Sequence, residues 1–255
     1  MRNILAGVHR EVLREFVWSN VLLAFDYDGT LAPLVSTPSR ASMRASTRRS
    51  FRHVSRLYPL VVITGRAQRD MLMKLGNIEV SQVIGNHGAE PSLDPDTIRS
   101  RVKRWLPMLR ERLSDRQGVV IENKEFSVAI HYRHARERAS ARRAVLAAAH
   151  SLPEVRIVGG KLVVNLVLED VANKGVALER ERARLACERV IYVGDDETDE
   201  DAFRLRRRAP MLSIRVGRNR RSAATHYIRN QGEIDRLLLA LVALRRPSRT
   251  DSGRR

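Results

Sequence analysis

Two aspartates, Asp26 and Asp28, lie two residues apart where a short apolar run, Val21–Phe25, gives way to a turn. Side chains at positions i and i+2 of an extended segment point to the same face, so we expect both carboxylates at one spot, with Tyr27 facing away. Gly29 allows the tight turn that exposes them. One carboxylate can attack as a nucleophile while the other protonates a leaving oxygen and later activates water. The alternative interpretation is a turn with two capping aspartates.

A second acidic group follows another apolar run, residues 190–193. It contains Asp195, Asp196 and Asp199, whose negative charges repel one another unless a cation lies among them. Because the candidate ligands are all oxygens, the expected ion is magnesium, which keeps several waters in an octahedral shell. The alternative is an acidic helix N-terminus that the helix dipole stabilises. A second acidic pair at the end of another strand favours the metal site.

Two further residues are suited to binding an anion. Thr64 follows the apolar run Leu60–Ile63 and offers a hydroxyl group and backbone amides, and Lys174 lies at a predicted helix start and offers a point charge. A metal ion and a lysine together neutralise a phosphate dianion that an aspartate must approach. Taken singly, a helix-capping threonine and a surface lysine are the simpler interpretations. Together with the two acidic groups, in this order, they predict phosphoryl chemistry.

The apolar runs that precede these motifs predict a parallel sheet with helices on both faces. Runs of strand length occur at 21–25, 60–63, 82–84, 190–193 and 211–216, and they alternate with helical patterns. Ligands of such sheets bind beyond the carboxyl ends of the strands, which is where the polar motifs lie. The fold class is therefore predicted to be α/β.

The middle of the chain has a different pattern, in which a helix is followed by two strands and the unit occurs twice. This pattern predicts a small open sheet with helices on one side. The expected helices have apolar faces within 102–113 and 135–149. The expected hairpins pair 118–122 with 127–132 and 156–158 with 162–168, the second turning at Gly159-Gly160.

The net charge of +18 raises the question of nucleic-acid binding. Only five of the 47 basic residues are lysines, the arginines are scattered, and aromatic residues make up 5% without being interleaved among them. We therefore predict a small-molecule enzyme without a nucleic-acid partner. The single cysteine, Cys187, fits a reducing cytoplasm. The longest apolar stretch, residues 237–244, is too short to cross a bilayer, so no membrane association is expected.

The ordered motifs resemble those of the haloacid-dehalogenase-like phosphatases over about residues 21–216. The resemblance implies a Rossmann-like core formed by residues 1–92 and 170–246, and an inserted α+β type 2 cap at 93–169. Residues 247–255 are expected to be a disordered tail. The implied cofactor is Mg²⁺, and the implied site consists of a nucleophile (Asp26), a general acid and base (Asp28), phosphate-binding residues (Thr64, Gly65, Lys174) and metal ligands (Asp26, the Asp28 carbonyl, Asp195, Asp196, Asp199).

Within that superfamily the chain is most similar to trehalose-6-phosphate phosphatases. Stretches at 85–88, 121–124, 131–133 and 194–203, together with Ser127, carry this similarity. It implies hydrolysis of trehalose 6-phosphate, with the cap contacting the glucose unit that lacks phosphate. The candidate cap contacts are Lys124, His131 and Arg133, and the candidates on the core side are Arg66 and His87. A solvent-facing role for His131 and a helix-start role for Arg66 are the alternatives.

One residue departs from the pattern of that family. Asn165 stands where a glutamate is usual, and it brings no charge to the sugar hydroxyls. Glu169 lies four residues later, on the same face of an extended strand, and is the candidate replacement. Alternative substrates are therefore another sugar phosphate or a glycosyl-polyol phosphate, and phosphoryl transfer by a sugar mutase is a related possibility. A non-enzymatic anion-binding protein is disfavoured, because mere binding needs no nucleophile.

Overall fold

The larger unit of the molecule is built on a parallel sheet. Among the residues that the structure describes, which are 1–160, 162–205 and 209–245, seven strands join this sheet in the order β1-β11-β10-β9-β2-β3-β4 in the computed structural model. Neighbouring strands are parallel throughout, so their carboxyl ends share one edge. The strands are β1 (Arg2–Asn3), β2 (Val21–Phe25), β3 (Leu60–Ile63), β4 (Gln82–Ile84), β9 (Arg189–Gly194), β10 (Met211–Val216) and β11 (His226–Ile228).

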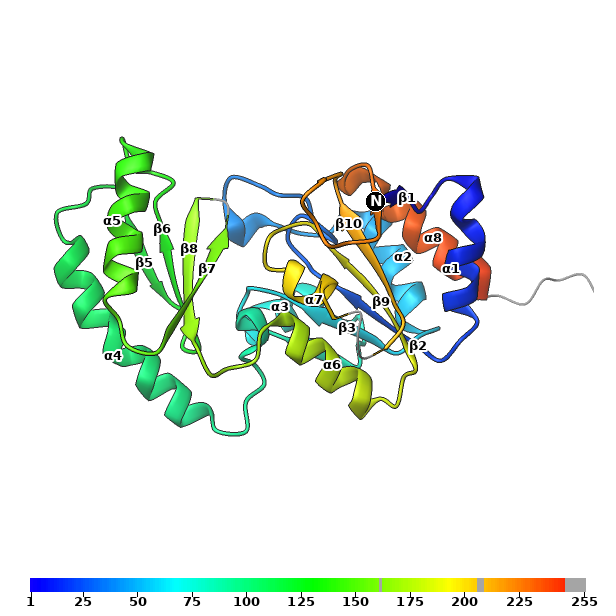
Figure 1. Ribbon diagram of the computed structural model, residues 1–255, viewed down its shortest axis with the longest axis horizontal. Helices are drawn as coiled ribbons and strands as arrows, with labels where there is room; N and C mark the ends of the chain where they lie inside the picture. The colour runs from blue at the N-terminus through cyan, green and yellow to red at the C-terminus, as the bar shows by residue number, and fades with distance from the viewer. Residues whose placement is uncertain (161, 206–208, 246–255) are drawn as a thin grey trace, which may run out of the picture.

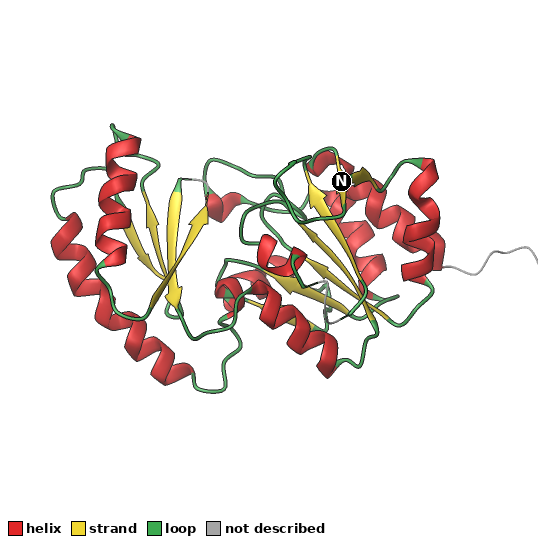
Figure 2. Ribbon diagram, in the orientation of Figure 1, coloured by secondary structure: helices red, strands yellow, loops and turns green. Residues whose placement is uncertain are grey.

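Helices cover both faces of this sheet (Figure 2). Strand β2 shows why, because Leu23 and Phe25 pack into one apolar cluster while Leu22 and Ala24 pack into another. A strand that is buried on both faces is apolar at every position, as β2 is. The first cluster includes side chains of α1 (Arg10–Val17), α2 (Ala45–Ser55), α3 (Gln68–Leu75) and α8 (Ile234–Arg245), and the second those of α6 (Lys174–Arg184) and α7 (Glu200–Phe203).

A smaller unit is inserted between β4 and α6, and we call it the cap. Its strands form an antiparallel sheet in the order β5-β6-β8-β7, and α4 and α5 lie on the side of that sheet away from the larger unit (Figure 1). The cap has its own apolar cluster, to which Trp105, Ile130 and Leu166 belong. Its elements are α4 (Pro95–Leu113), β5 (Val120–Asn123), β6 (Val128–His131), α5 (Arg138–His150), β7 (Val155–Gly160) and β8 (Val163–Leu168).

The register of the cap sheet decides which side chains face the larger unit. Ile130 and Leu166 point into the cluster beneath α4 and α5. Side chains alternate along a strand, so His131 and Asn165 project from the opposite, open face. Asn165 pairs with Ala129 across β6 and β8, which places it in the middle of that face.

The predicted fold class is confirmed, since a parallel core carries a separate antiparallel sheet. The predicted turn of the second cap hairpin is wrong, because Gly159 and Gly160 belong to β7 and Gly160 pairs with Val163. A Cβ atom on Gly160 would lie 2.7 Å from Val163 Cγ1, so close packing within the hairpin accounts for this glycine. Leu162 takes the left-handed conformation instead, with φ 62°. The predicted tail, 247–255, lies outside the described residues.

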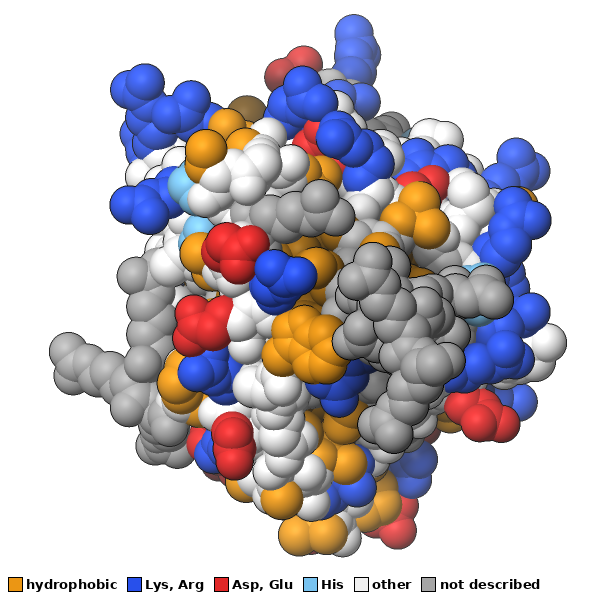
Figure 3. All heavy atoms as spheres, turned by 90° about the vertical axis from the view of Figure 1, so that its right-hand side faces the viewer, with side chains coloured by type: hydrophobic (Ala, Val, Ile, Leu, Met, Phe, Trp, Pro, Cys, Tyr) orange, Lys and Arg blue, Asp and Glu red, His pale blue; other side chains and the backbone are white. Residues whose placement is uncertain are grey.

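Basic side chains are distributed over the surface. Figure 3 shows the end of the molecule near α1 and α8, where lysine and arginine side chains stand around the rim with acidic and hydrophobic ones among them. Several arginines pair with carboxylates, and Arg101 contacts both Glu154 and Asp170. Within the described ranges, no helix has both the length and the apolar character that a membrane span requires.

Candidate active site

The carboxyl edge of the large sheet brings together residues predicted for catalysis, phosphate binding and metal binding. Asp26 directly follows β2, Thr64 follows β3 and Asp195 follows β9. Strand β2 lies between β3 and β9 in the sheet, so the three side chains occupy adjacent positions at the point where the strand order reverses direction. All three line a cleft of about 1220 Å³ whose opposite wall is formed by the cap.

Lys174 is the buried cation of this site. Its Nζ donates to Oδ1 of Asp26 and to Oδ1 of Asp199, each at 2.8 Å, and the residue is 2% exposed. Asn173 caps α6 by accepting the Val176 N–H, which fixes Lys174 in the first helical turn. Burial opposes the ammonium charge, but Asp199 and Asp26 outweigh it and raise the pKa of Lys174 well above its usual range. A fixed positive charge thus lies beside the candidate nucleophile.

Asp199 supports the loop that follows β9. Its Oδ1 accepts from Lys174 and from the hydroxyl of Tyr192 at 2.7 Å, and its Oδ2 accepts the backbone N–H groups of Asp195 and Asp196 at 2.8 and 3.0 Å. Gly194 is required beside it, because an added Cβ would lie 2.2 Å from Asp199 Cγ. These contacts suit a role for Asp199 in orienting the loop that carries Asp195 and Asp196.

The carboxylates at this edge fit a hard divalent cation. One ligand atom from each of Asp26, Asp195 and Asp199 lies within 4.8 Å of the others. Burial, followed by repulsion from Asp199 and Asp196, raises the pKa of Asp195 to about 7. Burial also raises the pKa of Asp26 well above its usual range, and Lys174 offsets this only in part. A cation among these oxygens relieves the repulsion, and an all-oxygen donor set suits Mg²⁺.

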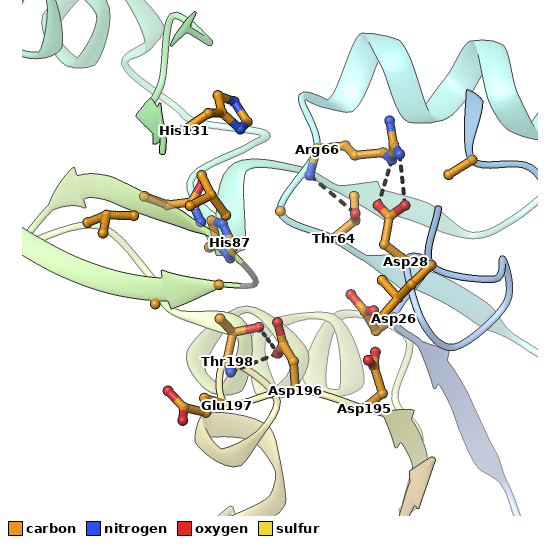
Figure 4. A pocket seen from close by; sticks show the side chains of 18 of the residues that line it. Asp26, Asp28, Thr64, Arg66, His87, His131, Asp195, Asp196, Glu197 and Thr198 are labelled. Atoms are coloured by element: carbon orange, nitrogen blue, oxygen red, sulfur yellow. Dashed lines mark hydrogen bonds and ion pairs between the residues drawn. The ribbon is translucent and has the colours of Figure 1, made fainter. Parts of the chain in front are cut away.

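Asp196 lies at the rim of this acidic group. Its Oδ1 accepts from the backbone N–H and the hydroxyl of Thr198, at 2.8 and 2.6 Å (Figure 4). Arg215 on β10 donates to the backbone carbonyl of Asp196 at 2.9 Å and to Glu200 at 3.1 Å. The loop is therefore held from two directions while Asp196 still lines the cleft.

Asp28 also lines the cleft, and its carboxylate is paired with Arg66 at 2.6 Å. Arg66 contacts Asp70 as well, so this predicted substrate-binding residue is engaged by two carboxylates. Thr64 and Gly65 line the cleft beside it, and the Thr64 hydroxyl accepts the backbone N–H of Arg66 at 3.2 Å. Thr64 and Gly65, which are predicted to bind phosphate, thus line the same cleft as Asp28.

His87 packs over Gly65 on the core side of the cleft. A Cβ on Gly65 would lie 2.5 Å from His87 Cε1, so only glycine fits beneath the ring. His87 is buried in a left-handed conformation, with φ 59°, and neither ring nitrogen has a hydrogen-bond partner in the part of the chain that the structure describes. Burial, and then the charges of Lys174 and Lys124, lower the pKa of His87 well below its usual value. The imidazole is therefore neutral at physiological pH.

The cap contributes the opposite wall of the cleft. Lys124 Nζ donates to the Gly65 carbonyl at 3.3 Å, and His131 Nε2 lies 2.8 Å from Glu122 Oε2. The hairpin is also tied to the core, because the hydroxyl of Ser127 donates to Asn86 Oδ1 at 2.6 Å. Predicted substrate-binding residues of the cap that line the cleft are Lys124, His131, Arg133 and Asn165.

Glu169 is placed differently from Asn165. Asn165 is 6% exposed and lines the cleft, whereas Glu169 is exposed beyond the end of β8 and is not among the described residues that line it. Strand β8 ends at Leu168, so the alternation that connects the two positions does not extend to Glu169. The structure therefore does not bring Glu169 to the site.

Some residues of the site escaped sequence reasoning. Glu122 lies in β5, two residues before Lys124, which directly follows that strand, and that spacing is a signal that could have identified it. Tyr192 lies inside a buried strand, where its hydroxyl contact with Asp199 leaves no mark in the sequence. Leu34 and Val35 line the cleft although they are 53% and 40% exposed, and they follow the first acidic motif.

Comparisons with known proteins agree with this site. The trehalose-phosphatase family model matches residues 24–231, which include all four motifs. The chain is 30% identical over 252 residues to a probable trehalose-phosphate phosphatase 4 from Oryza sativa subsp. japonica, covering 91% of this chain and 68% of that protein. It is also 30% identical over 240 residues to a trehalose-phosphate phosphatase from Mycobacterium marinum, covering 88% of this chain and 58% of that protein.

Solved structures show the same fold. The C-terminal domain of a trehalose-6-phosphate phosphatase from C. albicans superposes with a TM-score of 0.78 at 21% identity, covering 95% of this chain and 98% of that one. A trehalose-6-phosphate phosphatase related protein superposes with a TM-score of 0.71 at 24% identity, covering 88% of this chain and 97% of that one. With the family model spanning the core, the cap and every catalytic motif, this chain belongs to the trehalose-phosphatase family of phosphoric monoester hydrolases.

Proposed function

We propose that this chain hydrolyses trehalose 6-phosphate to trehalose and phosphate, using Mg²⁺ and an aspartyl-phosphate on Asp26. One observation carries the proposal, namely that Asp26 is buried between Lys174 and Asp195 at the base of a cleft with a polar opposite wall. The cleft, at about 1220 Å³, is somewhat larger than the usual small-molecule site and has room for a disaccharide. Membership of the trehalose-phosphatase family supports the same substrate.

In the first half-reaction, a carboxylate oxygen of Asp26 attacks phosphorus while the bond from phosphorus to the sugar oxygen breaks. Asp28 gives its proton to that oxygen, so trehalose leaves as a neutral alcohol. Lys174, Thr64 and Gly65 hold the phosphoryl oxygens. Asp26, Asp195 and the Asp28 carbonyl would hold Mg²⁺, with Asp196 and Asp199 ligating it or orienting its waters. The ion would supply positive charge that offsets the repulsion between carboxylate and phosphate.

In the second half-reaction, Asp28 is ionised and takes a proton from water. The water oxygen attacks phosphorus, the bond to Asp26 breaks, and inorganic phosphate leaves with Asp26 restored as a carboxylate. Lys174 Nζ lies 2.8 Å from Asp26 Oδ1, so the leaving carboxylate forms beside a positive charge.

The cap is proposed to recognise the glucose unit that carries no phosphate. Lys124, His131, Arg133 and Asn165 line the cleft across from Asp26, and His87 lies on the core side. We further propose residues 1–92 and 170–246 as the catalytic core and 93–169 as the lid, because the two units have separate apolar clusters. A cytoplasmic location stays a prediction.

A second substrate class is favoured by Asn165, which replaces the usual acidic residue at the centre of the open cap face. The second candidate is another sugar phosphate or a glycosyl-polyol phosphate. Phosphate release with Mg²⁺ across a panel of glycosyl and hexose phosphates tests both candidates. We expect the highest kcat/KM for trehalose 6-phosphate. Good turnover of another glycosyl phosphate, with none for trehalose 6-phosphate, would transfer the assignment to the second candidate.

A further inference from the structure

Arg66 joins two carboxylates at the edge of the cleft. Its Nε and Nη2 donate to the two oxygens of Asp28 at 2.6 and 2.7 Å, and its Nη1 donates to Asp70 at 2.8 Å. The guanidinium fork therefore occupies both Asp28 oxygens at once. Figure 4 shows the Asp28 carboxylate turned toward Arg66, while Asp26 and Asp195 lie lower in the pocket.

This pair is more constrained than an ordinary surface ion pair. The Arg66 side chain is 11% exposed, against 33% for Asp28 and 39% for Asp70. The Thr64 hydroxyl accepts the backbone N–H of Arg66, which holds the main chain from which the side chain extends, and the guanidinium carbon lies 5.7 Å from the centre of the Tyr27 ring. An exposed pair contributes little and leaves its partners mobile, whereas a bidentate arginine anchored on several sides restricts the rotamer of its carboxylate partner.

We propose that Arg66 is a positioning residue for Asp28, with Asp70 as its anchor, and that it does not bind the substrate. The inference rests on the proposed function, in which Asp28 delivers a proton to the sugar oxygen and then accepts one from water. Both transfers need the Asp28 carboxyl within hydrogen-bond reach of a reacting oxygen. Arg66 holds Asp28 at the cleft between the two proton transfers. Removing the Arg66 guanidinium therefore impairs both proton transfers without altering phosphate binding.

Arg66→Lys is the variant that separates this role from a substrate contact. Lysine keeps the positive charge but cannot bind both Asp28 oxygens and Asp70 together. On trehalose 6-phosphate, whose leaving oxygen needs the proton, we expect kcat to fall about tenfold to a hundredfold. On 4-nitrophenyl phosphate, whose leaving group needs no proton, the first-turnover release of nitrophenolate is expected to stay within about threefold of the unmodified enzyme.

The second proton transfer gives an independent signature. With 4-nitrophenyl phosphate as substrate, slower attack by water makes the phosphoenzyme accumulate. Acid quenching followed by mass spectrometry is expected to find a larger phosphorylated fraction in Arg66→Lys and in Asp28→Asn than in the unmodified enzyme. A loss of stability alone does not raise this fraction. Asp70→Asn, which leaves the Arg66–Asp28 pair in place but removes the anchor, is expected to show a smaller change in the same direction.

Arg69→Gln is the matched control, because Arg69 is an exposed arginine in α3, the helix that begins two residues after Arg66. It is expected to change neither rate nor phosphoenzyme level. Arg66→Lys added to Asp28→Asn is expected to cause no further loss of activity.

Equal losses of activity on both substrates, or a full additional loss in the double variant, would overturn the inference. Accumulation of the phosphoenzyme in Asp28→Asn but not in Arg66→Lys would overturn the inference and leave the proposed function standing. No phosphoenzyme in any variant, Asp28→Asn included, would count against the two-step mechanism as well.

Discussion

The two walls of the cleft are built in different ways. On the core side, Lys174 and Asp199 are 2% and 0% exposed, and each makes at least two charged contacts or hydrogen bonds. On the cap side, Lys124 donates to a backbone carbonyl at 3.3 Å, and the paired side chains of His131 and Glu122 are 28% and 49% exposed. The core wall is held by mutual contacts, while the cap wall leaves polar groups available to a ligand.

This contrast separates chemistry from recognition. Groups that attack phosphorus must be oriented before the substrate arrives, because any reorganisation adds to the barrier. Groups that recognise a sugar can adjust as the sugar binds, and they make different contacts with different substrates. Changes in the core wall should therefore affect all substrates alike, whereas changes in the cap wall should depend on the substrate.

The largest effect is expected for Asp26→Asn. An amide cannot act as the nucleophile, so turnover should fall by roughly 10⁴-fold or more on both trehalose 6-phosphate and an aryl phosphate. Phosphate release measures the loss, and circular dichroism checks that the variant is folded. Activity near that of the unmodified enzyme, in a preparation free of other phosphatases, would end the covalent mechanism.

Metal removal is expected to have a nearly equal effect, again on both substrates. Without a cation, Asp195 and Asp199 repel each other and the approaching phosphate. Excess chelator should abolish phosphate release, and added Mg²⁺ should restore it. Turnover that continues unchanged in excess chelator would refute the metal requirement.

A smaller and selective effect is expected for Arg133→Ala and Lys124→Ala in the cap. A lost hydrogen bond to a charged group costs roughly 1.5–3 kcal/mol, so kcat/KM for trehalose 6-phosphate should fall about tenfold to a hundredfold. Hydrolysis of an aryl phosphate, which is too small to reach the cap, should be nearly unchanged. Arg143→Ala, an exposed change on α5, is the matched control. Equal losses on both substrates would mean that these residues have a structural role.

Asn165→Glu sharpens the same comparison. A carboxylate is a stronger acceptor than an amide for sugar hydroxyls, so kcat/KM for trehalose 6-phosphate should rise by about twofold to tenfold. Steady-state kinetics on trehalose 6-phosphate and an aryl phosphate measure the change. A rise on both substrates, or a fall confined to trehalose 6-phosphate, would show that Asn165 is not a weakened sugar contact.

The smallest effect concerns pH and the stability of the metal-free protein. Burial raises the pKa of Asp195 to about 7, above its usual value of 3.8, so the folded state favours the protonated form. The stability that this group contributes is complete below the usual pKa and is lost as the pH rises through 7. The melting temperature measured in chelator should therefore fall as the pH rises from 5 to 8. The fall should be smaller in Asp195→Asn. Equal pH profiles in both proteins would contradict this.

The same contrast explains what could be predicted from the sequence. Asp26, Thr64 and Lys174 each follow a strand or begin a helix, and the topology of a parallel sheet brings such positions together. The cap contacts depend on the register of antiparallel strands, which small shifts alter. The turn expected at Gly159-Gly160 was therefore misplaced, and Glu169 lies beyond the end of β8. The Arg66–Asp28 pair depends on rotamers, which no spacing in the sequence specifies.

The proposed mechanism is tested most directly by rapid quenching with trehalose 6-phosphate that carries a labelled phosphate. In the presence of Mg²⁺, the label should appear transiently on Asp26 before inorganic phosphate is released, and trehalose should form no later than the phosphoenzyme. Asp26→Asn should carry no label. Release of trehalose without any labelled protein, or a label on a residue other than Asp26, would contradict the mechanism proposed for this site.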